Sequence, residues 1–251
     1  MKYRVLAALA AFLAIGLAIG LAIGCNADPG ADNGMGIDEP APLPAPTMKA
    51  PKYPPGPYAV TRGATIPNFS FSGFIGGKTS PTISLEAFYN PHAGDPSYQP
   101  ADPSQDDRLF PAGSPYGAGT SKPTALLVDI ASVWCGPCNE EAKNTLNGLY
   151  AKYKPCGGEF LFQLAEGAAP GVPVTEQTLK AWVSLYKVTY PATWDPQKQL
   201  FPLYSADSFP DSAIIDTKTM KIVDVISGVP DTTFWTTYES LLDASCLAAG
   251  E

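Results

Sequence analysis

The amino-acid sequence predicts an α/β domain in which helices flank a central mixed sheet. Three observations support this fold class. Residues 124–131 form a near-continuous apolar run, which is typical of a strand buried on both faces. Strand-like and helix-like patterns alternate after this run, and two short strands around a polar turn close the alternation. We therefore place one α/β domain at residues 59–251.

Two short strands are expected before the buried strand, as an N-terminal extension of the sheet. Residues 66–71 alternate apolar and polar side chains, and residues 83–85 form a second candidate. Residues 90–123 are rich in Pro, Gly, Ser and Asp, so they predict a loop inserted into the domain. The loop holds the single histidine, His92, but its acidic residues do not follow the spacing of a calcium loop. We expect a solvated loop, with a lid or a metal site as the alternatives.

The elements after the buried strand follow from apolar periodicity. A helix comes first, with one apolar face made of Ala142, Leu146, Leu149, Tyr150 and Tyr153. Residues 159–165 predict a strand, and residues 175–187 predict a helix with an inward face of Leu179, Trp182, Val183 and Tyr186. Residues 212–216 and 221–226 predict the two closing strands. Asp231 can cap a last helix whose core face holds Phe234, Trp235, Tyr238, Leu241 and Leu242.

The net charge of the chain argues against two kinds of binding partner. The formal net charge is −8, and removing residues 1–24, which contain Lys2 and Arg4 and no acidic residue, leaves −10. An acidic domain argues against nucleic acid as a partner, because binding to phosphates needs clustered Lys and Arg. It also argues against a basic patch for a membrane surface.

Residues 1–24 predict a secretory signal peptide, since two basic residues precede an apolar run at 5–24. Residues 21–25 (LAIGC) resemble the lipobox of bacterial lipoproteins, whose cysteine, here Cys25, becomes the lipidated first residue. An uncleaved membrane helix and an ordinary cleaved signal are the alternatives. All three would place the rest of the chain outside the cytoplasm, where disulfides can persist. Residues 25–58 are rich in Pro, Gly, Ala and Asp, and predict a lipid-anchored, extended linker.

The chemistry centres on Trp134-Cys135-Gly136-Pro137-Cys138, which lies between the buried strand and the first helix. Cys135 would stand at the N-terminus of that helix, where unpaired backbone N–H groups and the helix dipole favour a thiolate. A Cys-x-x-Cys pair so placed has a lowered pKa on its exposed sulfur, and the thiolate is the nucleophile. Pro137 suits a first helical turn, where its missing N–H is not needed.

A zinc site and an inert structural disulfide are the other interpretations of this pair. Zinc generally needs four ligands, but the chain has no second Cys-x-x-Cys motif, and its one histidine lies in the predicted loop. We therefore expect neither a metal nor a cofactor, and interpret Cys135 and Cys138 as a redox pair.

Residues 126–138 (LLVDIASVWCGPC) closely resemble the active-site segment of thioredoxins. From about residue 63 to residue 247, the chain resembles the exported, membrane-attached branch of that superfamily, the TlpA/ResA-like thiol–disulfide oxidoreductases, in a lipoprotein form. The resemblance implies a thioredoxin fold, with Cys135 as the attacking cysteine and Cys138 as the resolving one.

Two further positions carry over from the same resemblance. Asp129 stands six residues before Cys135, where thioredoxins keep a buried acid, and a desolvated carboxyl can relay the proton of the resolving thiol. A solvent-facing acid at a strand edge is the alternative. Residues 209–216 resemble the cis-proline segment of the family, with Pro210 as the cis residue. An ordinary trans proline is the alternative there, and Pro191 is the rival candidate.

In this family the cis-proline loop faces the redox pair and offers backbone groups to the substrate chain. The resemblance therefore implies that Phe209 and Pro210 bind substrate together with Gly136 and Pro137. Trp134 is interpreted either as part of the same substrate surface or as simple packing.

Weaker matches concern Glu141, which corresponds to a glutamate of the active-site helix, and Gly228, which corresponds to a glycine before the last helix. With Cys25 lipidated and the redox pair joined, Cys156 and Cys246 remain. Each follows a helix pattern, and in the thioredoxin fold those two helices share one face of the sheet. The resemblance thus implies a structural disulfide between them.

The resemblance implies thiol–disulfide exchange with exported proteins that carry disulfides or dithiols, on the periplasmic side of a bacterial membrane. The dipeptide Gly136-Pro137 looks like that of reducing thioredoxins, which favours reduction with electrons from a membrane donor. Two other classes stay open. One is a non-catalytic binding or assembly module with this fold. The other is a peroxide-reducing enzyme, whose peroxidatic cysteine usually lacks a partner two residues on.

Overall fold

The computed structural model describes residues 53–203 and 209–250. The predicted signal peptide, the lipidation at Cys25 and most of the predicted linker lie outside these residues. The end of that linker contacts the domain, since the Tyr53 hydroxyl donates a hydrogen bond to the Ile66 carbonyl (2.9 Å). Of the helices in the described residues, none combines the length and the apolar character that crossing a membrane requires.

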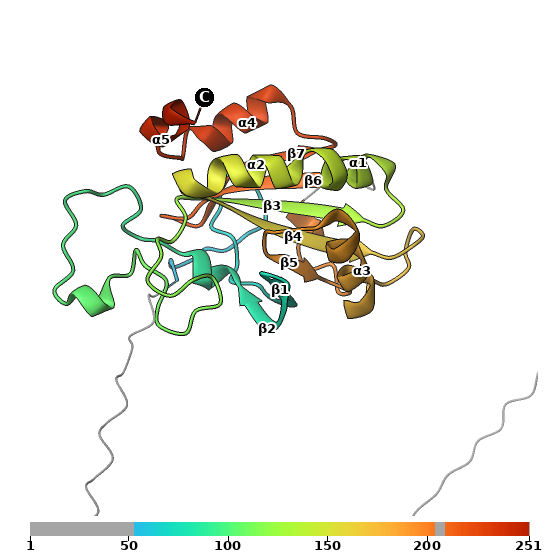
Figure 1. Cartoon of the computed structure of the whole chain (residues 1–251), viewed down its shortest axis with the longest axis horizontal. Coiled ribbons are helices and arrows are strands. Elements are labelled where there is room, and N and C mark those ends of the chain that lie inside the picture. Colours follow the sequence, from blue (N-terminus) through green and yellow to red (C-terminus); the bar gives the residue numbers. More distant parts are fainter. Residues whose placement is uncertain (1–52, 204–208, 251) are drawn as a thin grey trace, which may run out of the picture. The chain divides into compact units, whose positions relative to one another are not determined.

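Within the described residues, the strands are β1 (Ser70–Ile75), β2 (Lys78–Ser84), β3 (Ala125–Ser132), β4 (Gly158–Glu166), β5 (Ala192–Trp194), β6 (Asp211–Asp216) and β7 (Lys221–Ser227). They form one sheet in the order β2-β1-β5-β4-β3-β6-β7 (Figure 1). β3 is central, because it pairs parallel with β4 on one side and antiparallel with β6 on the other. β5 extends the parallel side, and β7 forms an antiparallel hairpin with β6.

The described helices are α1 (Gly136–Asn144), α2 (Leu146–Tyr153), α3 (Glu176–Tyr186), α4 (Thr232–Glu239) and α5 (Ala244–Ala249). A β-α-β unit from β3 to β4 is thus followed by a β-β-α unit from β6 to α4. This is a thioredoxin-like fold with a mixed central sheet, as the sequence predicts. The antiparallel hairpin of β1 and β2 adds the predicted N-terminal strands at the β5 edge.

Both faces of β3 are buried, as its continuous apolar run predicts. Alternate residues from Ala125 to Ala131 face a first hydrophobic cluster, which contains the buried residues of α1, α2, α3 and α4. The intervening residues, from Leu126 to Ile130, face a second cluster formed with the N-terminal strands and the inserted loop. The strand that leads to the redox pair therefore lies between two layers of packed side chains.

The first predicted strand begins later than the sequence pattern indicates. β1 starts at Ser70, whereas residues 66–71 were expected. Pro67 has no backbone N–H and cannot donate to a neighbouring strand. Ile66 instead lies near the far edge of the sheet, where its N–H donates to the Met220 carbonyl (2.9 Å).

The single helix predicted after the redox pair is in fact two helices, α1 and α2. They are separated by Thr145, whose backbone leaves helical geometry (φ −125°, ψ −58°). A β-branched residue has a lower helix propensity than the straight-chain residues around it. The short strand β5 was not predicted, because three residues are too few to show a periodicity.

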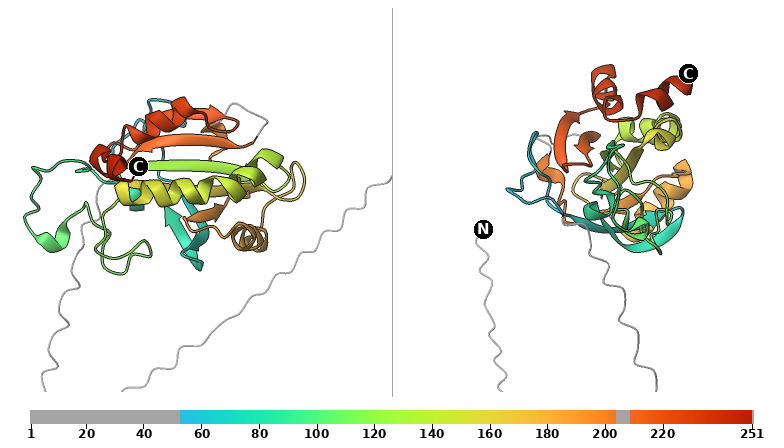
Figure 2. Two further views of the ribbon diagram at one scale, coloured as in Figure 1. Left: turned by 45° about the horizontal axis from the view of Figure 1, so that its top comes forward. Right: turned by 90° about the vertical axis from the view of Figure 1, so that its left-hand side faces the viewer.

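The inserted loop at 90–123 extends from one end of the sheet (Figure 1, Figure 2). Most of its residues are exposed or partly exposed, and one part of the loop packs on the domain. The Phe110 side chain is buried in the second cluster and stacks on Tyr116 (ring centroids 5.1 Å apart). At its base, the Asn90 amide donates to the carbonyls of Lys122 (3.3 Å) and Pro123 (3.2 Å), which holds the two ends of the loop together.

A second disulfide joins Cys156, just after α2, to Cys246 in α5, with a Cα–Cα distance of 5.4 Å. The Asp243 N–H also donates to the Cys156 carbonyl (3.0 Å). These two links attach the C-terminal helix to the chain just before β4.

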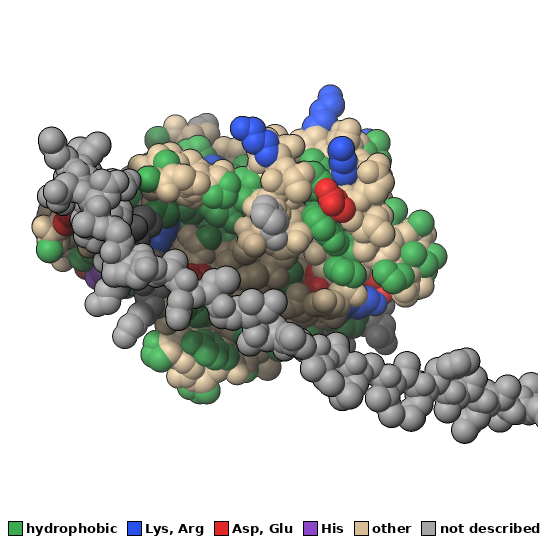
Figure 3. All heavy atoms as spheres, turned by 90° about the horizontal axis from the view of Figure 1, so that it is seen from below, with side chains coloured by type: hydrophobic (Ala, Val, Ile, Leu, Met, Phe, Trp, Pro, Cys, Tyr) green, Lys and Arg blue, Asp and Glu red, His purple; other side chains and the backbone are tan. Residues whose placement is uncertain are grey.

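One face of the surface is seen in Figure 3. In its visible part, hydrophobic side chains form several patches between polar ones, and Lys and Arg side chains lie near one another at the upper edge with an acidic side chain close below them.

Candidate active site at the junction of β3 and α1

The two cysteines of the Cys-x-x-Cys motif lie where β3 leads into α1. Cys135 is the N-cap residue of α1, and its Sγ accepts a hydrogen bond from the Cys138 N–H (3.1 Å). The sulfur atoms are joined, with an S–S distance of 2.05 Å. Pro137 lies in the first turn of the helix. When this disulfide opens, the N–H groups of the first turn can stabilise a thiolate on Cys135.

In this oxidised form both cysteines are buried, with exposed fractions of 3% for Cys135 and 2% for Cys138. The sequence predicted an exposed sulfur on Cys135, so this expectation is corrected for the oxidised state. The cause is packing, because both residues belong to the first cluster. The exposed part of the motif is made of its neighbours, Trp134, Gly136 and Pro137.

Asp129 is buried in the middle of β3, not solvent-facing at an edge. Its position alternates with residues that face the second cluster, so it lies on the side of the first cluster, which also contains the two cysteines. The Ser212 hydroxyl on β6 donates to its Oδ1 (2.9 Å). Burial is the main cause that raises the pKa of Asp129 from 3.8 to about 7. The hydrogen bond from Ser212 acts in the opposite direction, and the charge of Asp211 adds a smaller rise. The carboxyl can therefore gain or lose a proton near neutral pH.

A second buried carboxyl, Glu141, comes from α1, three residues after Cys138. Burial raises its pKa from 4.5 to about 8, and the charge of Asp129 contributes to this rise. Its Oε2 has no hydrogen-bond partner among the described residues. Tyr190 is buried near both carboxyls, and burial together with their charges raises the pKa of its hydroxyl. Two titratable carboxyls are thus buried on β3 and on α1, the two elements between which the redox pair lies.

The loop before β6 contains the cis bond that the sequence placed at Pro210. The Phe209–Pro210 bond is cis, and Pro191 is not among the cis prolines of the described residues. The Phe209 ring packs edge-on against Trp134 (ring centroids 5.8 Å apart, 76° between planes). This contact brings the loop next to the turn that precedes Cys135. The Gly228 N–H donates to the Pro210 carbonyl (2.8 Å), and the φ of Gly228 is 93°, a conformation that favours glycine.

Asp211 lies in the predicted cis-proline segment, but the sequence assigned it no role. It is fully buried at the start of β6, and its Oδ1 accepts a hydrogen bond from the Ser227 hydroxyl (2.6 Å). Burial raises its pKa from 3.8 to about 6, against the hydrogen bond from Ser227. The sequence could have indicated this residue, because Asp211 stands directly between the predicted cis-proline and an apolar strand.

Asn139 and Tyr186 were also missed. The Asn139 amide donates to the carbonyls of Val133 (3.1 Å) and Cys135, and its own oxygen accepts from the Tyr186 hydroxyl on α3. These bonds hold the turn that carries the redox pair against α1 and α3. The partners lie up to 47 residues apart, so no local pattern indicated them.

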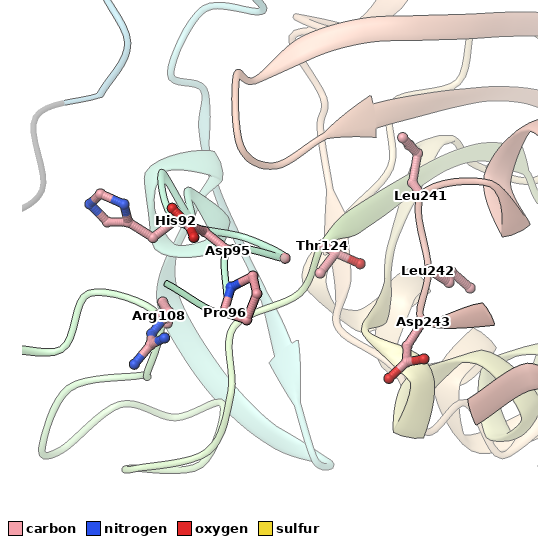
Figure 4. A pocket seen from close by; sticks show the side chains of 9 residues that line it. His92, Asp95, Pro96, Arg108, Thr124, Leu241, Leu242 and Asp243 are labelled. Atoms are coloured by element: carbon pink, nitrogen blue, oxygen red, sulfur yellow. The ribbon is translucent and has the colours of Figure 1, made fainter. Parts of the chain in front are cut away.

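An open cavity of roughly 520 Å³ lies at the other end of β3, between the inserted loop and the turn before α5 (Figure 4). It is lined by His92, Asp95 and Arg108 on one side and by Leu241, Leu242 and Asp243 on the other, with Thr124 between them. It is therefore separate from the disulfide. In the described part of the chain, no group of three or more His, Cys, Asp or Glu side chains is arranged to hold a metal ion.

Fold and site together define a thioredoxin-like protein with a Cys-x-x-Cys disulfide at the N-terminus of the helix that follows its central strand. In sequence, the chain is similar to the protein named thiol-disulfide oxidoreductase ResA in Bacillus species. It is 31% identical over 107 residues to a ResA protein of Bacillus cereus and 29% identical over 107 residues to that of Bacillus anthracis. Each match covers 43% of this chain and 57% of the relative, so the chain spans just over half the length of these relatives. No protein-family model matches the chain.

Solved structures with a related backbone include the thioredoxin domain of a thiol-disulfide oxidoreductase from Bacteroides vulgatus. It has a TM-score of 0.48 and 16% identity, and covers 72% of this chain and 97% of that one. A secreted thiol-disulfide isomerase from Corynebacterium glutamicum has a TM-score of 0.45 and 14% identity, with 70% and 83% covered.

Proposed function

We propose that this chain is a thiol–disulfide oxidoreductase that reduces disulfides of exported proteins through Cys135 and Cys138. One observation carries the proposal: the Cys135–Cys138 disulfide caps α1, and two buried carboxyls with raised pKa values belong to the strand before it (Asp129) and to that helix (Glu141). The similarity to ResA proteins supports the same class of reaction.

The reaction begins with the reduced enzyme. The Cys135 thiolate attacks one sulfur of a client disulfide, so that bond breaks and a mixed disulfide forms, and the first client thiolate takes up a proton. The Cys138 thiol then loses its proton and attacks the Cys135 sulfur. The mixed disulfide breaks, the second client sulfur leaves as a thiolate and takes up a proton, and the enzyme is left with the Cys135–Cys138 disulfide. Two electrons pass from the dithiol to the client, and no cofactor enters these steps.

Asp129 is the proposed acceptor of the Cys138 proton. A carboxyl with a pKa of about 7 is partly ionised at neutral pH, so it can take the proton and return it. Glu141, with a pKa of about 8, lies close enough to interact with the charge of Asp129 and can share the proton. A base whose pKa is close to the working pH is the most effective proton carrier.

The client is proposed to meet the rim of the disulfide. Trp134, Gly136 and Pro137 are the exposed residues beside the cysteines, and Phe209 and Pro210 form the neighbouring loop. The Cys156–Cys246 disulfide has a structural role in this proposal, because it attaches α5 and lies beyond α2 from the redox pair.

The location and the electron source belong to the same proposal. A lipid on Cys25 would anchor the protein on the periplasmic side of a bacterial membrane. A membrane protein that carries reducing equivalents outward would then reduce the Cys135–Cys138 disulfide again. Labelling cells with a radioactive fatty acid, for the natural chain and for Cys25→Ala, tests the anchor, since only the natural chain should be labelled.

Insulin reduction with dithiothreitol as the electron source tests the activity. The natural protein should accelerate reduction, Cys135→Ser should abolish the acceleration, and Cys156→Ser with Cys246→Ser should retain it as the matched control. An inert natural protein would support a binding or assembly module instead, and consumption of peroxide would support a peroxide-reducing enzyme. The direction is tested by the reduction potential of the redox pair. A value near roughly −270 mV, as in thioredoxin, agrees with a reductase, and a value near roughly −120 mV contradicts it.

A further inference from the structure

Five side chains beside the redox pair form a closed ring of contacts, which we call the Trp134 frame. The Trp134 indole N–H donates to Glu166 Oε2 (2.7 Å), and Glu166 Oε1 forms an ion pair with the Lys198 ammonium. The same ammonium lies 5.3 Å from the centre of the Phe201 ring. Phe201 contacts Phe209 (6.1 Å between ring centroids), and Phe209 packs edge-on against Trp134 (5.8 Å).

The frame connects four segments of the chain. Trp134 directly precedes Cys135, and Phe209 directly precedes the cis-proline. Glu166 is the last residue of β4, and Lys198 belongs to the turn after β5. The proposed function uses Trp134 and Phe209 but gives no role to Glu166 and Lys198.

Glu166 has a buried carboxylate that is stabilised by two polar partners, the Trp134 indole and the Lys198 ammonium. Its side chain is 7% exposed, and burial alone would raise its pKa. Hydrogen bonds from Lys198, Trp134 and the Gly171 backbone outweigh burial and lower that pKa below its usual value. A charged, buried carboxylate therefore holds the indole on one side and the ammonium on the other, and losing either donor would leave it poorly paired.

Lys198 is held in place by its own backbone. It is a non-glycine residue with a φ of 53°, an uncommon left-handed conformation. Buried Asp195 organises this turn, since its carboxylate accepts hydrogen bonds from the N–H groups of Gln197 (3.1 Å) and Gln199. The turn that Asp195 stabilises therefore holds the Lys198 ammonium next to Glu166.

We propose that Glu166 and Lys198 are positioning residues that hold Trp134 and Phe209 as a preformed apolar surface for protein clients beside the redox disulfide. This rests on the proposed function. Trp134 is 36% exposed, and an aromatic side chain that is already fixed loses little entropy when a client packs on it. The favoured client carries an apolar side chain next to its disulfide. A small disulfide without such a side chain does not depend on the frame.

The test compares a protein client with a small one. Rates of reduction of insulin and of hydroxyethyl disulfide are measured for the natural full-length chain, Lys198→Met, Glu166→Gln and Lys198→Arg. Lys198→Met and Glu166→Gln should raise the KM for insulin about tenfold, the loss expected for one charged hydrogen bond, with kcat and the rate on hydroxyethyl disulfide unchanged. Lys198→Arg should restore the KM. Lys152→Met, which removes the ion pair with Glu239 between α2 and α4, is the matched control and should behave as the natural chain.

A spectroscopic measurement separates positioning from a general loss of structure. The indole N–H signal of Trp134, assigned by its disappearance in Trp134→Phe, should move in Lys198→Met and Glu166→Gln and stay in place in Lys152→Met. An unchanged KM for insulin in both frame variants, or an equal loss with both substrates, overturns the inference while the proposed function stands. A natural chain that reduces neither substrate overturns both.

Discussion

Replacing Asp129 by asparagine should make the protein more stable above pH 7 and slower in exchange. Asparagine has nearly the same volume and keeps an oxygen that can accept the Ser212 hydrogen bond, but it cannot ionise. The folded-state pKa of Asp129 is raised from 3.8 to about 7. Ionisation of Asp129 therefore lowers the free energy of unfolding. This loss is absent below about pH 4, grows up to about pH 7 and is constant above that pH.

The size of the gain follows from that pKa. A difference of about three pH units, at about 1.36 kcal/mol each, sets an upper bound of about 4 kcal/mol. Any rearrangement around the amide group reduces this value. We expect Asp129→Asn to be more stable than the natural chain by about 2–4 kcal/mol at pH 8.5 and by little at pH 4.

Urea unfolding of the oxidised proteins at pH 4, 6 and 8.5 measures the difference. Asp243→Asn is the control without this pH dependence, because hydrogen bonds from Ser245 and Cys246 lower the pKa of that carboxyl below 3.8. Its difference from the natural chain should be nearly the same at the three pH values, since the carboxyl ionises below this range. If the advantage of Asp129→Asn is the same at every pH, Asp129 ionises normally in the fold and the buried-acid argument fails.

The same variant tests the proton transfer. Between pH 6 and pH 8, resolution of the mixed disulfide by Cys138 should accelerate in the natural chain as Asp129 ionises. In Asp129→Asn this step should be slower, by about tenfold or more at pH 8, because general bases contribute at least that much. The rate of this second step is measured by stopped flow in both proteins. If Asp129→Asn has the same pH profile as the natural chain, Asp129 has no part in the mechanism.

Three further predictions concern its neighbours and the stability of the domain. Ser212→Ala should raise the pKa of Asp129 and Asp211→Asn should lower it, because the first loses a hydrogen bond to the carboxylate and the second loses a like charge. Opposite shifts in the pH profile of exchange are expected, and shifts of the same sign contradict the assignment. The double variant Cys156→Ser, Cys246→Ser should lose about 2–4 kcal/mol in urea unfolding while exchange persists, since a bridge across 90 residues constrains the unfolded chain. If exchange disappears in the folded variant, that disulfide takes part in the reaction. Phe110→Ala should cost about 3–5 kcal/mol and Leu109→Ala distinctly less, because Phe110 is 2% exposed in the second cluster. A loss in Phe110→Ala as small as that in Leu109→Ala would show that Phe110 does not contribute to the core.

Much of the fold was predictable from local patterns. The continuous apolar run of β3, the periodic faces of α3 and α4 and the closing strands are short-range signals, because burial repeats with the period of each element. The position of Cys135 at the N-terminus of α1 follows from the same logic, since a motif between a strand and a helix can only cap that helix. Errors appeared where the pattern was short or ambiguous, as in the three residues of β5 and the break at Thr145.

The sequence by itself determined the fold class, the strand that leads to the redox pair, and which two cysteines are separated by only two residues. Only the tertiary structure decided which side chains surround that pair. Ser212 bonds to Asp129, Glu166 bonds to Trp134, and Lys198 bonds to Glu166. The partners in each bond are 32 or more residues apart in the chain. Such contacts depend on how the strands are ordered and aligned in the sheet. A one-residue change in register would turn the side chains of a strand to the opposite face, so no local pattern of residues encodes them.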